Sequence, residues 1–431
     1  MYRPIRHILS GLFILLAIGS ATAQTRTYSP FSRYGLGEIN DRGYGTNNSM
    51  GGVGIGVRGA NGLNILNPAS YSAMDSMSFF LEVGLSSHSQ SLKSGGQSQS
   101  FSDIDFEYFA FGFPIHKKVG VSLGIKPAAQ SGYQFQTIGN TLEPTIQTSM
   151  GAGNISSLFG GVGYEITPNL SLGANASFWF GSVYHKSYSY FTNSPESQIY
   201  GIRNEHKTNS LLLDLAAQYT INLSDQKNFT FGATYSPSLP TNGTSSRLTA
   251  YGTSIGIEKE LFGYNNIIES ETDTTKWSDA NFKFPSKIGV GASYNIKDKL
   301  TLAADFTLEE WGSVVFPDNN ITQTADASKF ALGAEWIPNE RTGTKYFQRI
   351  RYRAGFHYAN EYIKIDNNQL KNYAVSVGLG LPLRRTKTSI NLGYEYGNRG
   401  TFEKDALKEV YQRISLSLTM HEFWFIKRKF N

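Results

Sequence analysis

Period-two alternation of apolar and polar side chains, repeated at the spacing of β-hairpins, is the feature that most constrains this sequence. From residue 78 onward, segments such as Leu170–Phe178 and Leu211–Tyr219 place large apolar residues at every second position. This pattern is typical of strands with one apolar face. The intervening positions hold many small and charged residues, which favours a transmembrane β-barrel with a polar interior over a soluble sandwich.

The number of strands follows from a parity argument. Fifteen segments carry the pattern, and a closed antiparallel barrel with both chain ends on one side of the membrane needs an even number. Thr244–Glu258 is the weakest segment, because its alternation fades, so the sequence predicts an all-β, 14-stranded antiparallel transmembrane barrel without it. The candidate segments begin near residues 78, 102, 118, 156, 170, 209, 228, 244, 284, 299, 328, 349, 371, 387 and 410.

With fourteen strands, the connections alternate between short and long. Short periplasmic turns and long outer loops are the usual asymmetry of outer-membrane barrels. His185–Thr208 and Pro237–Asn281 are among the longest connections, and the sequence predicts that both are strand-free and form the outer mouth. Loops of this length in compact proteins are usually functional or disordered.

Composition supports a membrane barrel. Aromatic residues make up 13% of the chain and charged residues 17%, which suits a barrel with aromatic girdles. Lys and Arg number 39 against 34 Asp and Glu, a balance too even to predict nucleic-acid binding. The chain has no cysteine, which excludes disulfides, thiolate metal ligands and a lipid anchor on cysteine.

The N-terminus carries an export signal. Arg3 and Arg6 precede the apolar run Ile8–Ile18, and Ala21-Thr22-Ala23 forms a cleavage site before Gln24. The apolar run is shorter than the roughly 20 residues of a membrane helix. We therefore predict a signal peptide at 1–23, cleavage after Ala23, and localisation in the outer membrane.

A glycine-rich run follows within Met50–Ala73. Such a run permits backbone conformations that other residues avoid and close approach to a neighbouring surface. It predicts a hatch that plugs the lumen, with an N-terminal arm and hatch at 24–77 and the barrel at 78–431. The predicted hatch motif consists of Gly51, Gly52, Gly54, Asn67, Pro68 and Ala69.

No catalytic, cofactor or metal site is expected. Gly54–Gly59 satisfies G-x-G-x-x-G, but no helix pattern follows it, so nucleotide binding is a poor interpretation. The histidines form no metal-ligand motif, and nothing resembles a nucleophile with its base. The sequence therefore predicts a protein that is not an enzyme.

Charged residues at inward positions have two interpretations. Glu335 and the pair Arg351 and Arg353 lie on consecutive strands, so an interior ion pair is plausible. A structural role in holding the hatch and wall is the favoured interpretation. The alternative is that Arg351 and Arg353 bind the carboxylate head group of a ligand. The predicted inward charges are Glu82, Asp105, Glu107, Asp214, Asp305, Glu335, Arg351, Arg353 and Glu395.

Several stretches resemble one family. The glycine run closing on Asn67-Pro68-Ala69, Phe284–Gly291 followed by Asp305 and Trp311, and Phe330–Trp336 followed by Tyr352–Gly355 are similar to the FadL/OmpP1/TodX-type outer-membrane transport proteins. Ser29–Gly35 and Trp424–Lys429 resemble a divergent, Bacteroidetes-like branch. The resemblance implies a barrel with a lumenal hatch that carries long-chain fatty acids and other hydrophobic compounds.

Pro127 lies inside the third predicted strand. Proline cannot donate to a β-ladder and is found at edges or bulges, so a local defect in the wall is expected there. The resemblance implies an inward kink of the third strand that opens a lateral gate to the bilayer, with Pro127, Ala128 and Ala129 as candidates. An equally good interpretation is that Pro127 lies above the membrane, where the strand ends.

Two functions remain open from the sequence. The first is a channel for passive uptake of hydrophobic, fatty acid-like molecules with lateral release into outer-membrane lipid. The second is a binding or scaffold barrel, or an adaptor of a secretion machinery, that does not transport. A continuous apolar groove under the outer loops would favour transport, and a flat exposed aromatic patch with a sealed wall would favour docking. Fold alone does not decide between them.

Overall fold

The computed structural model describes residues 29–60, 62–94, 97–139, 145–191, 199–252, 269–316, 324–341, 344–365, 367–383, 387–401 and 407–423. The predicted signal peptide with its cleavage site, and the C-terminal Trp424–Lys429, lie outside these residues.

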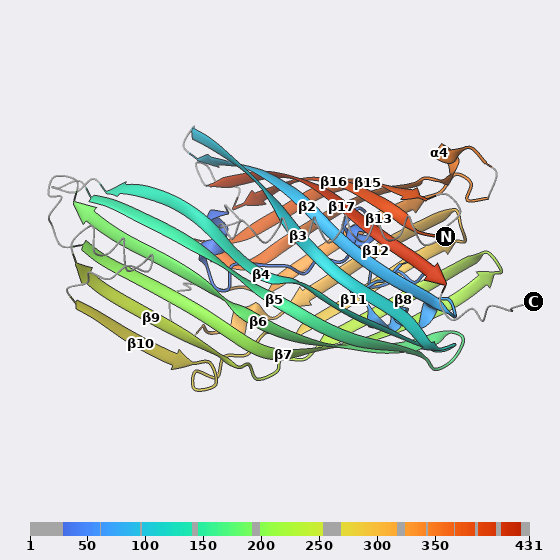
Figure 1. Ribbon diagram of the computed structural model, residues 1–431, viewed down its shortest axis with the longest axis horizontal. Helices are drawn as coiled ribbons and strands as arrows, with labels where there is room; N and C mark the ends of the chain where they lie inside the picture. Colours follow the sequence, from blue (N-terminus) through green and yellow to red (C-terminus); the bar gives the residue numbers. More distant parts are fainter. Residues whose placement is uncertain are drawn as a thin grey trace, which may run out of the picture.

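The strands form a closed antiparallel barrel of 14 strands (Figure 1), as the parity argument predicts. Each strand pairs with the next along the ring, and the last closes on the first from Lys408↔Lys93 to Phe423↔Ser78. The barrel strands are β2 (Ser78–Ser94), β3 (Gln97–His116), β4 (Val119–Gly139), β5 (Thr145–Glu165), β6 (Leu170–Phe191), β7 (Ile199–Ser224), β8 (Lys227–Ser236), β11 (Lys287–Ile296), β12 (Leu300–Glu309), β13 (Ala327–Trp336), β14 (Arg351–Ile365), β15 (Asn368–Pro382), β16 (Ser389–Gly400) and β17 (Lys408–Phe423).

The weakest predicted segment forms a strand outside the ring. β9 (Gly243–Gly252) and β10 (Glu269–Lys276) form a hairpin, and β9 pairs with the outer part of β7 from Thr208↔Gly243 to Ile199↔Gly252. β8 pairs directly with β11, so the ring closes without the hairpin. The segment predicted to lie outside the ring, Thr244–Glu258, is therefore the one that contributes β9 to the hairpin beside it.

The prediction of long strand-free loops is wrong. β6 runs to Phe191 and β7 begins at Ile199, so most of His185–Thr208 is strand, and Pro237–Asn281 contains β9 and β10. The regular apolar alternation becomes sparse toward the outer strand ends, where Gln134 and Gln136 are exposed beside Ile138, whereas the backbone ladder continues. In Figure 1, β4–β7 and the β9–β10 hairpin extend together well beyond the rest of the barrel.

Side chains alternate between the two faces as predicted. Leu211, Val290 and Ile414 point outward and are each more than half exposed, whereas Ser210 and Gln218 point inward and are buried. The outer surface is therefore apolar and the interior polar, which is the arrangement of a lipid-embedded barrel. Within the described part of the chain, no helix is both long and apolar enough to cross a membrane.

The N-terminal segment lies in the lumen and forms the hatch. Its regular elements are short: η1 (Pro30–Arg33), β1 (Glu38–Ile39), α2 (Gly45–Asn48) and η2 (Pro68–Ala73), while η3 (Trp311–Ser313) and α4 (Tyr346–Arg349) belong to barrel connections. The Gly51 N–H donates to Ser376 Oγ on β15 at 2.9 Å. Gly51 has a φ of +70°, and a Cβ there would lie 2.6 Å from the backbone oxygens of Leu332 and Phe356. Only glycine allows this approach to the wall.

Candidate functional site

The glycine run is anchored by one carboxylate of the wall. Asp305 on β12 accepts hydrogen bonds from the N–H groups of Gly54 at 2.6 Å and Ile55 at 2.8 Å, with Gly56 at 3.5 Å. Asp305 is buried. The N–H groups that formally match a phosphate-binding motif are therefore occupied by a wall carboxylate. The described residues also contain no group of three metal-ligating acidic or histidine side chains.

The Asn67-Pro68-Ala69 motif connects the glycine run of the hatch to η2. The Asn67 side chain caps η2 by accepting from the Ala69 N–H at 3.1 Å, and its amide donates to the Ile55 carbonyl at 2.8 Å. Pro68 occupies the first position of η2, where its missing N–H has no cost. The motif fixes the glycine run against η2, which packs on the inner face of β4–β7.

An apolar cluster of the chain's own side chains fills the outer mouth of the lumen. Phe31 and Leu36 of the N-terminal arm are buried members of it, and within the same cluster Phe316 stacks on Trp311 and lies tilted against Phe282. The buried members are Phe31, Leu36, Ala128, Ala129, Ile155, Val183, Trp277, Phe282, Phe284, Trp311, Phe316, Tyr362, Ile363 and Leu370. The arm thus occupies the place where an apolar ligand would enter.

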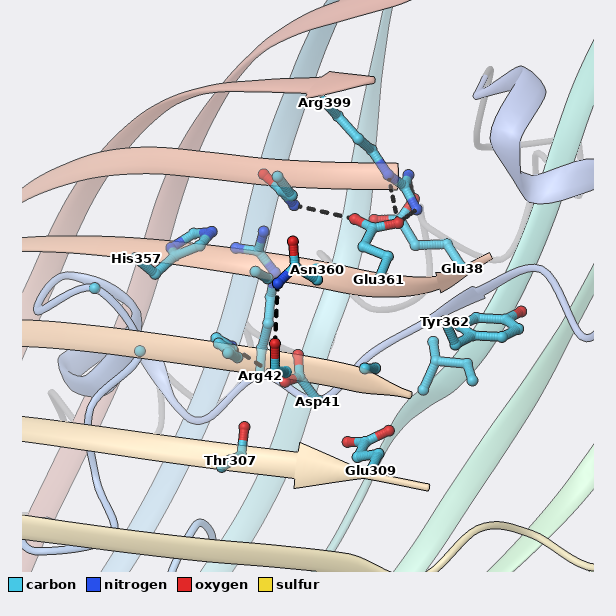
Figure 2. Close-up of a pocket in the computed structure, with 18 of the residues that line it drawn as sticks. Glu38, Asp41, Arg42, Thr307, Glu309, His357, Asn360, Glu361, Tyr362 and Arg399 are labelled. Atoms are coloured by element: carbon cyan, nitrogen blue, oxygen red, sulfur yellow. Dashed lines mark hydrogen bonds and ion pairs between the residues drawn. The ribbon is translucent and has the colours of Figure 1, made fainter. Parts of the chain in front are cut away.

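A charged cavity of about 120 Å³ lies between the arm and strands β12–β16 (Figure 2). Arg399 on β16 pairs with Glu361 at 2.6 Å and with Glu38 of the arm at 3.4 Å. Figure 2 shows these three side chains pointing toward one another across the cavity. The wall therefore holds the arm by charge as well as by apolar packing.

Two further ion pairs join the arm to the wall. Arg42 pairs with Glu395 on β16 at 2.9 Å, and Asp41 pairs with Lys329 on β13 at 3.1 Å. Together with the two pairs of Arg399, these pairs give nearly every charged side chain that lines the cavity a partner of opposite charge. Such a lining suits water and fixed ion pairs and does not suit an apolar solute.

The arm carboxylates are ionised at neutral pH. Burial alone would raise the pKa of Glu38, but nearby positive charges, above all Arg399, hold the pKa below its ordinary value. Burial would likewise raise the pKa of Asp41, but Lys329 and then Lys287 outweigh it and the pKa lies well below its usual range. Both shifts stabilise the charged pairs that seat the arm.

The two arginines predicted for a ligand head group lie outside this cavity. Arg353 is buried, with its Nε 2.7 Å from Glu335 Oε2 and its Nη1 2.8 Å from Asn391 Oδ1. Arg351 pairs with Glu340 at 2.9 Å. The predicted ion pair between Glu335 and this arginine pair is thereby confirmed for Arg353. Both guanidinium groups already hold carboxylates of the protein itself.

The wall changes at Pro127. β3 and β4 are paired only from His116↔Val119 to Phe109↔Ile125, and they separate beyond Ile125. Against β5, the ladder skips Ala128 between the pairs Pro127↔Ser156 and Ala129↔Ile155. Figure 1 shows the outer ends of β3 and β4 diverging, with the N-terminal segment (blue) visible between them.

The arm occupies part of this separation. β1 pairs antiparallel with β4 through Glu38↔Gln130 and Ile39↔Ala129. The Asn40 N–H donates to the Ala128 carbonyl at 2.8 Å. Ala128 and Ala129 are both fully buried in the apolar cluster. The three predicted lateral-opening residues therefore lie together, directly beneath a two-residue strand supplied by the arm.

Sequence reasoning missed the residues of the charged cavity. Glu361 and Arg399 fell in predicted outer loops, because apolar alternation stops before them. A usable signal was present: Glu361 has the parity of Arg353 on β14, and Arg399 has the parity of Glu395 on β16. Extending the inward register by a few residues would have placed both in the lumen.

Solved structures of transport barrels share this fold. A CymD monoaromatic hydrocarbon channel matches with a TM-score of 0.58 at 15% identity, over 88% of this chain and 97% of that chain. The toluene transporter TbuX of Ralstonia pickettii matches with a TM-score of 0.58 at 17% identity, over 88% and 97%. A Pseudomonas aeruginosa FadL homologue matches with a TM-score of 0.57 at 13% identity, over 90% and 99%.

These matches confirm the FadL-type resemblance at the level of the fold, since identities this low carry no more than that. No curated protein matches the sequence. A family model described as BamG matches residues 4–431, which is nearly the whole chain. The chain belongs to the BamG family.

Proposed function

We propose that this protein is an outer-membrane accessory barrel of Bam, the β-barrel assembly machinery, and that it acts by docking to protein partners. The family name supports association with Bam. The lipid-facing barrel and the export signal expected at residues 1–23 support localisation in the outer membrane. The proposed role involves no catalysis and no cofactor.

The state of the lumen is the observation that carries this proposal. The outer mouth is packed with buried side chains of the chain itself, including Phe31 and Leu36 of the arm. Beneath them lies a small cavity lined by ion pairs such as Arg399–Glu361. A hydrophobic solute would have to displace the first layer and strip water from the second, and transfer of charges to an apolar environment is costly.

The outer wall supplies a surface for docking. β4–β7 extend above the lipid-facing band, and the β9–β10 hairpin widens the same sheet. Outward residues on these outer parts include both polar and apolar side chains: Gln134 and Gln136 of β4 are exposed, and Ile138 is 67% exposed. A broad exposed sheet of mixed polarity suits a protein partner.

Purification under mild conditions tests the proposal. We expect affinity-tagged protein, extracted in gentle detergent, to bring down the central Bam barrel in near-stoichiometric amount and no excess of hydrophobic ligand. A tagged outer-membrane barrel of unrelated function serves as the control for incidental recovery. Recovery of the protein without Bam, carrying a bound fatty acid or aromatic compound, would contradict the docking role.

The separation of β3 and β4 favours a second candidate, a channel for hydrophobic molecules with lateral release. Its opening would be formed by Pro127, Ala128 and Ala129, beside the point where the β3–β4 ladder ends. The matched structures named as a monoaromatic hydrocarbon channel and a toluene transporter support this candidate by analogy of fold. It requires that the arm strand β1 leave the gap during passage.

Pro127→Val separates the two candidates. Valine restores a backbone N–H that can heal the ladder, so lateral release predicts lower uptake of a labelled long-chain fatty acid with normal barrel assembly. Docking predicts unchanged uptake. Pro114→Val is the matched control, because Pro114 lies at the end of β3 that is paired with β4, away from the separation at Pro127. Both candidates predict that it leaves uptake unchanged.

A further inference from the structure

The separated ends of β3 and β4 leave two strand edges without a neighbouring strand over most of their length. Among the described residues, β3 continues beyond Phe109↔Ile125 to Gln97 with β2 as its paired strand, while β4 continues to Gly139 and pairs with β5 and, over two residues, with β1. Unpaired strand edges present N–H and C=O groups that readily pair with another chain. In a closed barrel such edges are unusual, because closure normally removes them.

The outward face beside these edges is exposed and mixed in polarity. On β4, Gln134 and Gln136 are exposed, and Ile138 farther along is 67% exposed. On β3, Ile104 is 68% exposed. The edges are therefore not covered on their outward side, so a polypeptide of another protein can reach them.

The protein already satisfies part of both edges with substitutes for a strand. On β4, Gly132 donates its N–H to the hydroxyl of Ser32 at 3.1 Å, next to the two residues that pair with β1. On β3, the Ile104 N–H donates to the carboxylate of its own neighbour Asp103 at 2.7 Å. The side chains of Ser32 and Asp103 thus accept the N–H groups that a paired strand would accept through its carbonyls. An added strand could replace the contact between Asp103 and the Ile104 N–H, which is exposed.

The floor of this cleft contains an unpaired buried acid. Glu107 lies at the bulge of β3, is 9% exposed, and lines a small cavity together with Lys126 and Arg413. Neither of its carboxylate oxygens has a hydrogen-bond partner among the described residues. Lys126 instead donates to the carbonyl of Arg42 at 3.1 Å. Arg42, Lys126 and Arg413 lie near enough to line the same cavity, yet none of them donates a hydrogen bond to Glu107. Buried carboxylate oxygens without a hydrogen-bond donor are costly, and a cationic donor would relieve that cost.

We propose that the cleft between β3 and β4 takes an extended polypeptide segment of a partner protein, added as a strand along the free edge of β3 with a basic side chain at Glu107. The free edge requires an extended backbone, as in other cases of strand addition. Glu107, whose carboxylate oxygens accept no hydrogen bond among the described residues, favours a basic side chain at this position. The β1 strand, which already adds to β4 in the same cleft, shows that the site accommodates added strands. This inference rests on the proposed docking function and specifies its mode.

Peptide binding to the full-length barrel in detergent tests the site. The probe is a short fluorescein-labelled peptide of alternating Thr and Val with a central Lys, and its matched partner carries Glu at that position. We expect saturable binding of the Lys peptide, measured by fluorescence anisotropy, and markedly weaker binding of the Glu peptide. Glu107→Gln should weaken binding of the Lys peptide by about tenfold to a hundredfold.

Two variants distinguish peptide binding at this site from non-specific binding to the barrel. Ile104→Pro removes the N–H at the free edge and should abolish binding, whereas the barrel should assemble, since proline is tolerated where the N–H faces away from the ladder. Glu271→Gln alters an exposed acid on β10, in the hairpin outside the ring, and should leave binding unchanged. Equal binding to the parent, Glu107→Gln and Ile104→Pro would overturn the proposal.

The same preparations distinguish this inference from the docking function. If the central Bam barrel co-purifies but the Lys peptide does not bind, the strand-addition site is wrong and docking stands. If the peptide binds as expected but no Bam barrel co-purifies, the site stands and the Bam association is wrong. Binding that begins only after deletion of residues 24–28 would mean that the chain fills its own cleft, and would overturn a partner strand.

Discussion

Deletion of residues 24–77 is expected to turn the barrel into an open pore. The hatch fills the lumen from the apolar cluster at the mouth down to η2, and its backbone lies against the wall at Gly51 and Gly54. Without it, the polar interior of a wide barrel admits water and small solutes. Leakage of a small sugar from reconstituted vesicles should rise from background to the level of an open porin.

Deletion of the β9–β10 hairpin, residues 243–276, is the matched control. The hairpin lies outside the ring, which closes through β8 and β11, so its loss should leave leakage at background. Both deleted proteins must show the heat-modifiable migration of a folded barrel. Background leakage from a folded protein without residues 24–77 would show that the lumen is closed by something other than the hatch.

Asp305→Ala is expected to loosen the hatch without unfolding the barrel. The Asp305 carboxylate accepts close N–H groups from Gly54 and Ile55, and hydrogen bonds to a charged group contribute about 1.5–3 kcal/mol each. Loss of both should lower the free energy that seats the glycine run by about 3 kcal/mol or more. Hydrogen exchange across residues 51–59 should accelerate strongly, and sugar leakage should become intermittent.

Glu309→Gln on the same strand provides the comparison for that variant. Glu309 pairs with Lys287 on the wall at 2.7 Å and accepts no hydrogen bond from the described residues of the hatch. Its substitution should leave exchange in residues 51–59 unchanged. Equal exchange rates in the parent and in Asp305→Ala would show that the Asp305 contacts do not hold the glycine run.

The sequence predicted the ring because its signal is local and repeated. Each strand carries outward apolar residues at period two, and the requirement for an even number removed the segment that became β9. The ion pair between Glu335 and Arg353 was predictable for the same reason, because neighbouring strands in register bring inward charges together. Pairing between adjacent strands is thus encoded within short stretches of sequence.

The arm and its cavity could not be predicted in this way. β1 is a two-residue strand that pairs with β4 about ninety positions away, through Ile39↔Ala129. Arg399 meets Glu38 across the lumen, and no periodicity connects these residues. Toward the outer strand ends polar residues such as Gln134 and Gln136 interrupt the outward apolar pattern, so the periodic signal fades while the strands continue. The apolar cluster of the chain's own side chains at the outer mouth could therefore be recognised only from the structure.

Depletion of this protein from growing cells separates docking from transport most directly. Folding of newly made, pulse-labelled outer-membrane β-barrels is followed by heat-modifiable migration, and uptake of a labelled long-chain fatty acid is measured in the same cells soon after depletion. A docking subunit of Bam predicts that barrel folding slows while fatty acid uptake per cell stays constant. Normal barrel folding with a loss of uptake would contradict docking and favour a hydrophobic channel.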